Sequence, residues 1–280
     1  MKIIHYISIL LLVIFTSCSS DTDEIIPVNE VAGLVKIQSM ENESHLVELY
    51  SSSGQLEQGY NKISLRIKDK TDQKYVTNAS IQWTPIMHME TNQHSSPYSE
   101  VTKKPATESL YEGFIVFQMP ENPTEYWKLT LDYTVNGVNY TVTDRIAVPA
   151  SPRRRITVFT GTDGVRYILA LIDPASPKVA INEMSMGVFR MENMMTFPVV
   201  NGYKVKIDPR MPSMGNHGSP NNVDLMQSPE DNLYYGKLTL TMTGYWKINL
   251  QLENALGEVV KGEPVTDSNE ANSLFLELEF

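Results

Sequence analysis

The chain has 280 residues, and its 33 acidic residues outnumber the 23 basic ones to give a formal net charge of −10. A chain this acidic is a poor partner for nucleic acid or for an anionic membrane surface, because both carry the same sign of charge. Its single cysteine allows no disulfide within the chain, so a core must stabilise the body. The length is enough for two domains of ordinary size.

Residues 1–17 have the layout of an export signal. Lys2 is followed by a largely apolar run over residues 3–15, and small residues then precede Cys18. The run is shorter than the about 20 apolar residues that a membrane-spanning helix needs. We therefore expect a lipoprotein signal peptide at 1–17 that is removed on export.

The segment Ile14–Cys18 resembles the bacterial lipobox, with Phe15 where leucine is usual. This resemblance implies that Cys18 becomes the first mature residue and carries the lipid that anchors the protein to a membrane. The acidic stretch at 18–31 is similar to the surface-export signal of Bacteroidota lipoproteins, and a solvated acidic tether is the alternative. The expected location is the outer membrane, with the body facing the periplasm or the cell surface.

Strand patterns dominate the rest of the chain, and no long helical periodicity competes with them. The clearest β-type runs are Ile63–Ile67, Phe114–Phe117, Leu129–Leu131, Tyr167–Ile172, Leu238–Thr241 and Leu274–Leu276. Asn-Gly or Asp-Gly pairs predict tight turns at 136–137, 163–164 and 201–202. Short strands with turns at this spacing predict an all-β chain of immunoglobulin-like β-sandwiches.

The sequence also repeats itself. The run Leu110–Met119 is echoed by Leu233–Met242, and Glu125–Leu131 is echoed by Gly244–Leu250 with a Tyr-Trp-Lys triplet in both. The two echoes occur in the same order and at a similar offset, which two chance matches would rarely give. We therefore predict a tandem duplication.

Two modules follow from this repeat, one over 32–148 and one over 156–280. The segment 149–155 holds two prolines and three arginines, and proline denies a strand its ladder hydrogen bonds, so we expect a linker there. Trp127 and Trp246, the tryptophans of the two triplets, are expected to anchor the cores of the two sandwiches.

A third echo carries methionine and histidine. Pro85–Pro97 and Pro209–Pro220 both contain methionines and both end in His-x-Ser-Pro. Thioether sulfur and imidazole nitrogen suit Cu(I) better than hard cations. The candidate ligands are Met87, Met89, His94, Met211, Met214 and His217. The alternative is a structural loop without metal, just as Met184 and Met186, which alternate along a predicted strand, are expected to fill the core.

A further group of methionines, Met191, Met194 and Met195, precedes the turn at 201–202. A hairpin at this turn would fold the three side chains back toward Met211, Met214 and His217. That arrangement would add thioethers to the second candidate site.

The string from Met211 to Pro220, Met-Pro-x-Met-Gly-x-His-Gly-Ser-Pro, resembles a segment of YtkA-like domains, which are small exported immunoglobulin-like modules related to FixH. The resemblance covers one module, the second, and implies copper or heavy-metal handling by Met211, Met214 and His217. The internal echo extends this expectation to the first module, although that module lacks the Met-Pro and Met-Gly pairs.

The chain contains no His-Glu-x-x-His, no Gly-x-Ser-x-Gly and no glycine-rich phosphate loop. We therefore expect no enzyme. The sequence predicts a lipid-anchored protein that handles copper as Cu(I). The alternative is an adhesion, assembly or transporter-accessory module that binds an envelope protein without metal.

Overall fold

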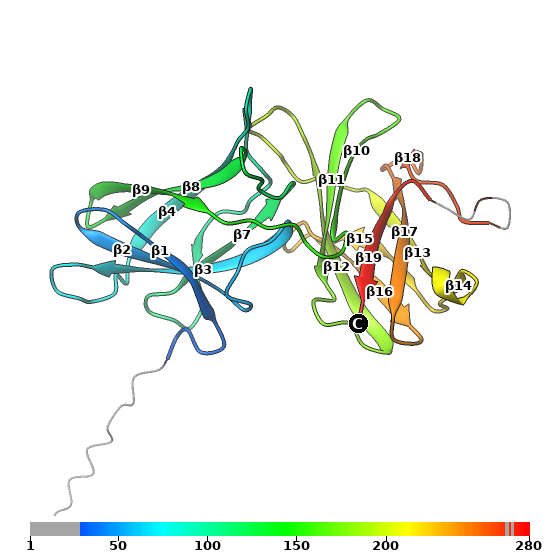
Figure 1. Cartoon of the computed structure of the whole chain (residues 1–280), viewed down its shortest axis with the longest axis horizontal. Helices are drawn as coiled ribbons and strands as arrows, with labels where there is room; N and C mark the ends of the chain where they lie inside the picture. The colour runs from blue at the N-terminus through cyan, green and yellow to red at the C-terminus, as the bar shows by residue number, and fades with distance from the viewer. Residues whose placement is uncertain (1–28, 267–268, 270–271) are drawn as a thin grey trace, which may run out of the picture.

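The computed structural model describes residues 29–266, 269 and 272–280 (Figure 1). The expected signal peptide, the lipid attachment point Cys18 and most of the expected tether lie outside the described residues. Within them the chain is all-β and its strands pair antiparallel, which confirms the predicted fold class. The described part contains a single 3-10 turn, Pro212–Met214, and none of its helices is long and apolar enough to cross a membrane.

The first half of the described chain, β1 to β9, is a sandwich of two sheets. One sheet has the order β1 (Val35–Glu41), β2 (His45–Ser51), β3 (Gly59–Asp69), β7 (Tyr111–Phe117) and β6 (Thr102–Lys103). The facing sheet has the order β5 (Gln93–His94), β4 (Ala79–His88), β8 (Tyr126–Val135) and β9 (Val138–Ile146). Alternate residues of β4 are buried, as expected for a strand with one face on a core.

The second half, β10 to β19, repeats this order. One layer has the order β10 (Ile156–Thr160), β11 (Arg166–Asp173), β12 (Ala180–Arg190), β16 (Tyr234–Leu240) and β15 (Val223–Gln227). The other contains β13 (Lys204–Met211), β17 (Tyr245–Glu253) and β18 (Val259–Lys261), with β14 (His217–Gly218) on β13 and β19 (Phe275–Glu279) on β17. Because β15 pairs with both β16 and β13, the two layers form one continuous curved sheet.

The two halves also share their core anchors. Trp127 and Trp246 are fully buried, as predicted. Each indole N–H donates a 3.0 Å hydrogen bond to a methionine carbonyl, that of Met119 in the first half and that of Met242 in the second. A buried indole therefore finds the same kind of partner in each half.

A buried asparagine fastens the start of the equivalent strands β3 and β12. The Asn61 amide donates to the carbonyls of Glu57 and Gly59 at 2.8 and 2.9 Å, and its oxygen accepts the Glu57 N–H at 3.0 Å. Asn182 forms the same three bonds at 2.9 Å each. The halves thus match in hydrogen bonding as well as in strand order, as a duplication predicts.

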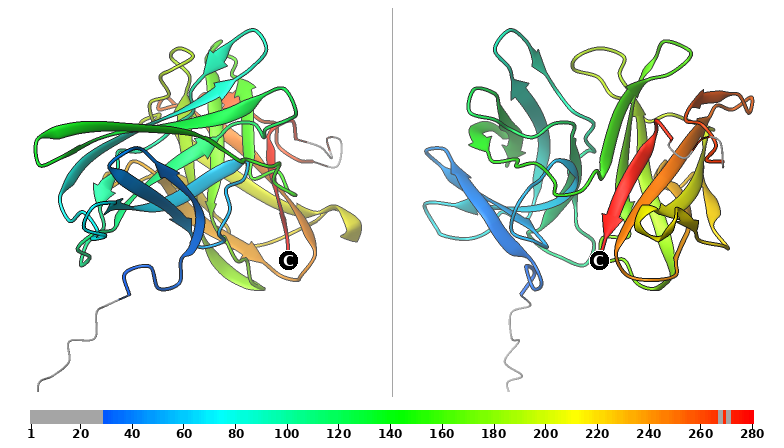
Figure 2. Two further views of the ribbon diagram at one scale, coloured as in Figure 1. Left: turned by 60° about the vertical axis from the view of Figure 1, so that its left-hand side comes forward. Right: turned by 45° about the vertical axis from the view of Figure 1, so that its right-hand side comes forward.

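The two halves lie side by side (Figure 2), and a separate apolar cluster packs between them. Its buried members are Val116 from β7 and Ile156, Ile168, Ala170 and Phe189 from β10, β11 and β12. Phe114 and Phe189 lie with their ring centroids 6.3 Å apart across this junction. The face of β3 and β7 that points away from the first core is therefore covered by the second half.

Candidate functional site

The echoed methionine and histidine segments occupy equivalent places. In the first half Met87 at the end of β4 lies opposite His94 of β5. In the second half Met211 at the end of β13 lies opposite His217 of β14. Both Met87 and Met211 are buried in the cores of their halves. The repeated sequence therefore corresponds to a repeated structure. In each half a buried methionine lies opposite a histidine on a short edge strand.

The three candidate ligands of the second half face different surroundings. Met211 packs into the core, whereas Met214 on the 3-10 turn is 57% exposed and His217 is exposed. Two of these side chains therefore face solvent while the third faces the core.

The candidate ligands of the first half come together differently. Met89 and His94 line a cavity of about 360 Å³ between the two halves. Met119 lines it from the first half, and Met191 and Met194 line it from the loop after β12. Four thioethers and one imidazole therefore surround one cavity, and both halves contribute to it.

The expected path of the methionine loop is wrong. Val200 donates its N–H to the carbonyl of Val188 at 2.9 Å, so the chain after β12 doubles back along β12 before β13 begins. Met191 packs in the cluster between the halves, whereas Met211 belongs to the core of the second half. The loop thus carries its methionines toward the first half and not toward the segment that begins at Met211.

His94 is held in a form suited to bind a metal. Its Nδ1 lies 2.6 Å from the carbonyl oxygen of Ser95, and a carbonyl can only accept a hydrogen bond. Nδ1 must therefore carry a proton, which leaves the lone pair of Nε2 free in the neutral ring. The ring also packs edge-on against Trp127 at 5.6 Å, so its orientation is fixed. Metal-binding histidines are commonly oriented by such a bond from the other ring nitrogen.

The backbone around the cavity is fixed from both halves. Ser95 donates its N–H to the carbonyl of Met194 at 2.8 Å, and Met191 donates its N–H to the carbonyl of Arg166 at 2.8 Å. The Gln118 side chain donates to the carbonyl of Ser95 at 3.3 Å. These bonds set the positions from which the thioethers reach the cavity.

Three other side chains complete the lining, namely Gln118, Arg166 and Phe197. Four of the eight side chains that line the cavity are therefore thioethers, one is an imidazole and one, Arg166, is charged. A carboxylate site for a hard cation would need oxygen ligands, and none of the side chains that line the cavity is a carboxylate.

Sequence reasoning named Met89 and His94 but missed Met119. Met119 belongs to the Leu110–Met119 echo, where it stood as part of a strand pattern. Its role at the cavity depends on contact between the halves, for which the sequence has no local signal.

No protein-family model matches the chain, and neither does any curated protein. Over the described ranges, no group of three or more His, Cys, Asp or Glu side chains is arranged to hold a metal ion. The case for a function therefore rests on the thioether cavity itself.

Proposed function

We propose that the chain is an exported, lipid-anchored protein that binds Cu(I) in the cavity between its halves. The observation that carries the proposal is the gathering of four thioethers and one imidazole around one cavity. Soft thioether ligands select Cu(I), and imidazole suits copper as well. The mature chain has only Cys18 as a thiol, which the lipid would occupy, so methionine is the soft ligand available.

These ligands suit reversible binding. Thioether sulfur takes no proton in the physiological range, so protons do not compete with the ion for the four methionine ligands. Met194 is 40% exposed, and its loop gives an ion a route between solvent and the cavity. Apolar walls exclude water from the bound ion, and a loop ligand that moves would release it to a partner.

Titration of the mature, unlipidated chain with Cu(I) against a competing chelator tests this function. We expect stoichiometric binding that a Met89→Leu/Met194→Leu variant loses, because leucine keeps similar volume but offers no sulfur. Met214→Leu is the matched control, since it removes a thioether that is exposed and lies outside the cavity. The proposal is wrong if the unmodified chain does not bind Cu(I), or if the double variant binds as well as the control.

The lipid anchor is part of the same proposal and needs its own test. We expect radiolabelled palmitate to be incorporated into the chain and to be absent from a Cys18→Ala variant. Fractionation is expected to place the labelled protein in the outer membrane. If the unmodified chain incorporates no palmitate, the proposed lipid anchor is wrong. Membership of the YtkA-like family stays a proposal, supported by the Met211-Pro-x-Met214 string.

The alternative function, an interaction module that binds an envelope protein, is favoured by the open edge of β4. The N–H of Ala79 and the carbonyl of Pro85 point away from β8, because both bond to side chains outside that ladder. By the two-residue period of a strand, Ile81 and Trp83 present their backbone groups on the same side, where no described strand pairs with them.

A groove of about 790 Å³ runs beside this edge. An extended peptide would add to β4 there through backbone hydrogen bonds. A chain that fails to bind Cu(I) but shows slowed amide exchange at Ile81 and Trp83 with an envelope extract would favour this function.

A further inference from the structure

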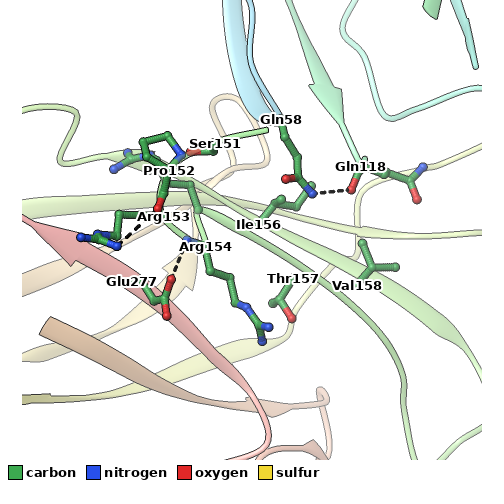
Figure 3. A pocket seen from close by; sticks show the side chains of 11 residues that line it. Gln58, Gln118, Ser151, Pro152, Arg153, Arg154, Ile156, Thr157, Val158 and Glu277 are labelled. Carbon is green, nitrogen blue, oxygen red and sulfur yellow. Dashed lines mark hydrogen bonds between the residues drawn. The ribbon is translucent and has the colours of Figure 1, made fainter. Parts of the chain in front are cut away.

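The segment that joins the halves lines a hollow of its own. Figure 3 shows this hollow, of about 460 Å³, between residues 151–158, Gln58, Gln118 and Glu277. Three arginines and one carboxylate line it. The hollow is thus a positive site on a chain whose net charge is −10.

Two of the three arginines are already engaged. Arg153 forms an ion pair with Glu279. The half-buried Arg155 guanidinium donates to the carbonyls of Ile172 and Pro174 at 3.3 and 3.2 Å. These contacts fasten the linker to β19 and to the end of β11, and leave the arginine between them to face the hollow.

Arg154 is that arginine. Its backbone bonds to Glu277, but its guanidinium forms no hydrogen bond or ion pair within the described part of the chain. The guanidinium carbon lies 4.2 Å from the centre of the Phe275 ring, and the side chain extends into the hollow beside Thr157 (Figure 3). Stacking on a ring holds the planar group while its N–H donors stay free.

A second cation strengthens the positive potential. Nζ of Lys247 lies 4.0 Å from the centre of the same Phe275 ring. Burial and the nearby charge of Arg154 lower the pKa of Lys247, although Glu277 opposes this. Two cations therefore share one ring. The carboxylate of Glu277, which also lines the hollow, already accepts a 2.8 Å hydrogen bond from the Tyr245 hydroxyl.

Neutral donors at the hollow are also unused. The hydroxyl of Ser151 is buried and has no hydrogen-bond partner among the described residues. Thr157, on β10, likewise has no side-chain hydrogen bond there, and it lines the hollow beside Arg154. Its hydroxyl is therefore free to donate to a ligand in the hollow.

We propose that this hollow binds the phosphate group of a phosphate monoester, with the Arg154 guanidinium as its main contact and the Thr157 hydroxyl beside it. Guanidinium presents two parallel N–H donors that match two phosphate oxygens. A monoester is largely a dianion near pH 7, which suits a guanidinium with free donors and a second cation, Lys247, on the same Phe275 ring outside the lining. The volume accommodates more than the bare anion, so the ester group has room.

Calorimetric titration with inorganic phosphate tests the site. We expect binding by the mature, unlipidated chain and at least about tenfold weaker binding by Arg154→Gln, since a charge-assisted bidentate contact is lost. Arg154→Lys, which keeps the charge but not the fork, is expected to fall between them. Arg190→Gln is the matched control, because Arg190 is an exposed arginine paired with Glu192 away from the hollow.

Two results would overturn the site: no binding of phosphate by the unmodified chain, or an equal loss in Arg154→Gln and Arg190→Gln, which would mean general charge attraction. Vesicles of phosphatidylcholine with and without phosphatidic acid then separate the sources of the phosphate. Arg154-dependent binding to phosphatidic acid assigns a lipid headgroup. Phosphate binding without vesicle binding assigns a small soluble ester.

Discussion

The N–H of Ser95 donates a 2.8 Å hydrogen bond to the carbonyl of Met194, and this bond joins the two halves beside the thioether cavity. The carbonyl of the same Ser95 accepts from His94 Nδ1. One residue therefore sets both the tautomer of the imidazole and the place of the loop that carries Met194. The cavity is built by contact between the halves and not within either one.

Cu(I) is accordingly expected to stabilise the folded chain. A ligand that binds only the folded state at 100 times its dissociation constant adds about 2.7 kcal/mol to the free energy of unfolding. Differential scanning calorimetry with and without Cu(I) measures this as a rise in Tm. The Met89→Leu/Met194→Leu variant is expected to show a much smaller rise, and equal rises in both proteins would place the bound ion outside the cavity.

The buried asparagines Asn61 and Asn182 are expected to contribute similarly to the stability of their two halves. Asn61→Ala removes three hydrogen bonds and Asn182→Ala removes four, and both leave backbone groups without partners, which should cost about 2–3 kcal/mol. Urea unfolding measures the cost. Asn139→Ala is the control, because Asn139 is exposed and accepts only one bond, from Thr134, so its effect should stay within about 0.5 kcal/mol. If Asn61→Ala and Asn182→Ala lose no more free energy of unfolding than Asn139→Ala, the prediction is wrong.

Gly113 of β7 has no room for a side chain. A Cβ there would lie 2.7 Å from Cζ2 of Trp83 and 2.9 Å from the carbonyl oxygen of Glu100. Gly113→Ala should therefore destabilise the chain by about 1–3 kcal/mol through overpacking. Gly218→Ala is the matched control, since its nearest new contact would be the flexible Arg210 side chain at 3.4 Å. Similar melting temperatures for the two variants would refute the steric argument.

Glu48 is expected to make the free energy of unfolding depend on pH. Burial raises the pKa of Glu48, but hydrogen bonds from Lys36, Tyr50 and Tyr75 outweigh this, so its pKa is lowered overall. A carboxyl whose folded pKa is lowered contributes stability above its unfolded pKa, near 4.3, and loses it as the pH falls through the folded value.

Glu48→Gln should therefore be less stable than the unmodified chain by about 1–3 kcal/mol at pH 7. The gap should begin to narrow as the pH falls below the unfolded pKa, near 4.3, and should close as the pH falls through the lowered folded pKa of Glu48. Urea unfolding at several pH values measures it, and a gap that is the same at pH 3 and pH 7 would show that the charge of Glu48 is not its cause.

Local features of the fold were predictable because local chemistry decides them. Asn136 and Gly137 have φ of 51° and 80° and close the β8–β9 hairpin, as their Asn-Gly pair predicts. Met184 and Met186 are fully buried, as expected from their alternate positions along a predicted strand. In these cases the conformation depends on neighbours in the sequence or on which face of a strand meets the core.

The cavity was not predictable for the opposite reason. Met191 reaches it because the chain doubles back after β12 and because Phe189 packs against the first half. A Gly202 with φ of 73° makes a turn, but the turn alone does not determine which surface the loop meets. Contact between two folded surfaces depends on their combined shape, which a single sequence does not display locally.

The segment between β9 and β10 does more than connect the two halves, because it also fixes their relative position. It is fastened by Arg153 to Glu279 and by Arg155 to two carbonyls, so its length sets how one half rests on the other. An insertion there would shift Met191 and Met194 relative to Met89 and His94 without altering any of the four. The affinity for Cu(I) that we propose for the cavity would therefore depend partly on a segment that does not line the cavity.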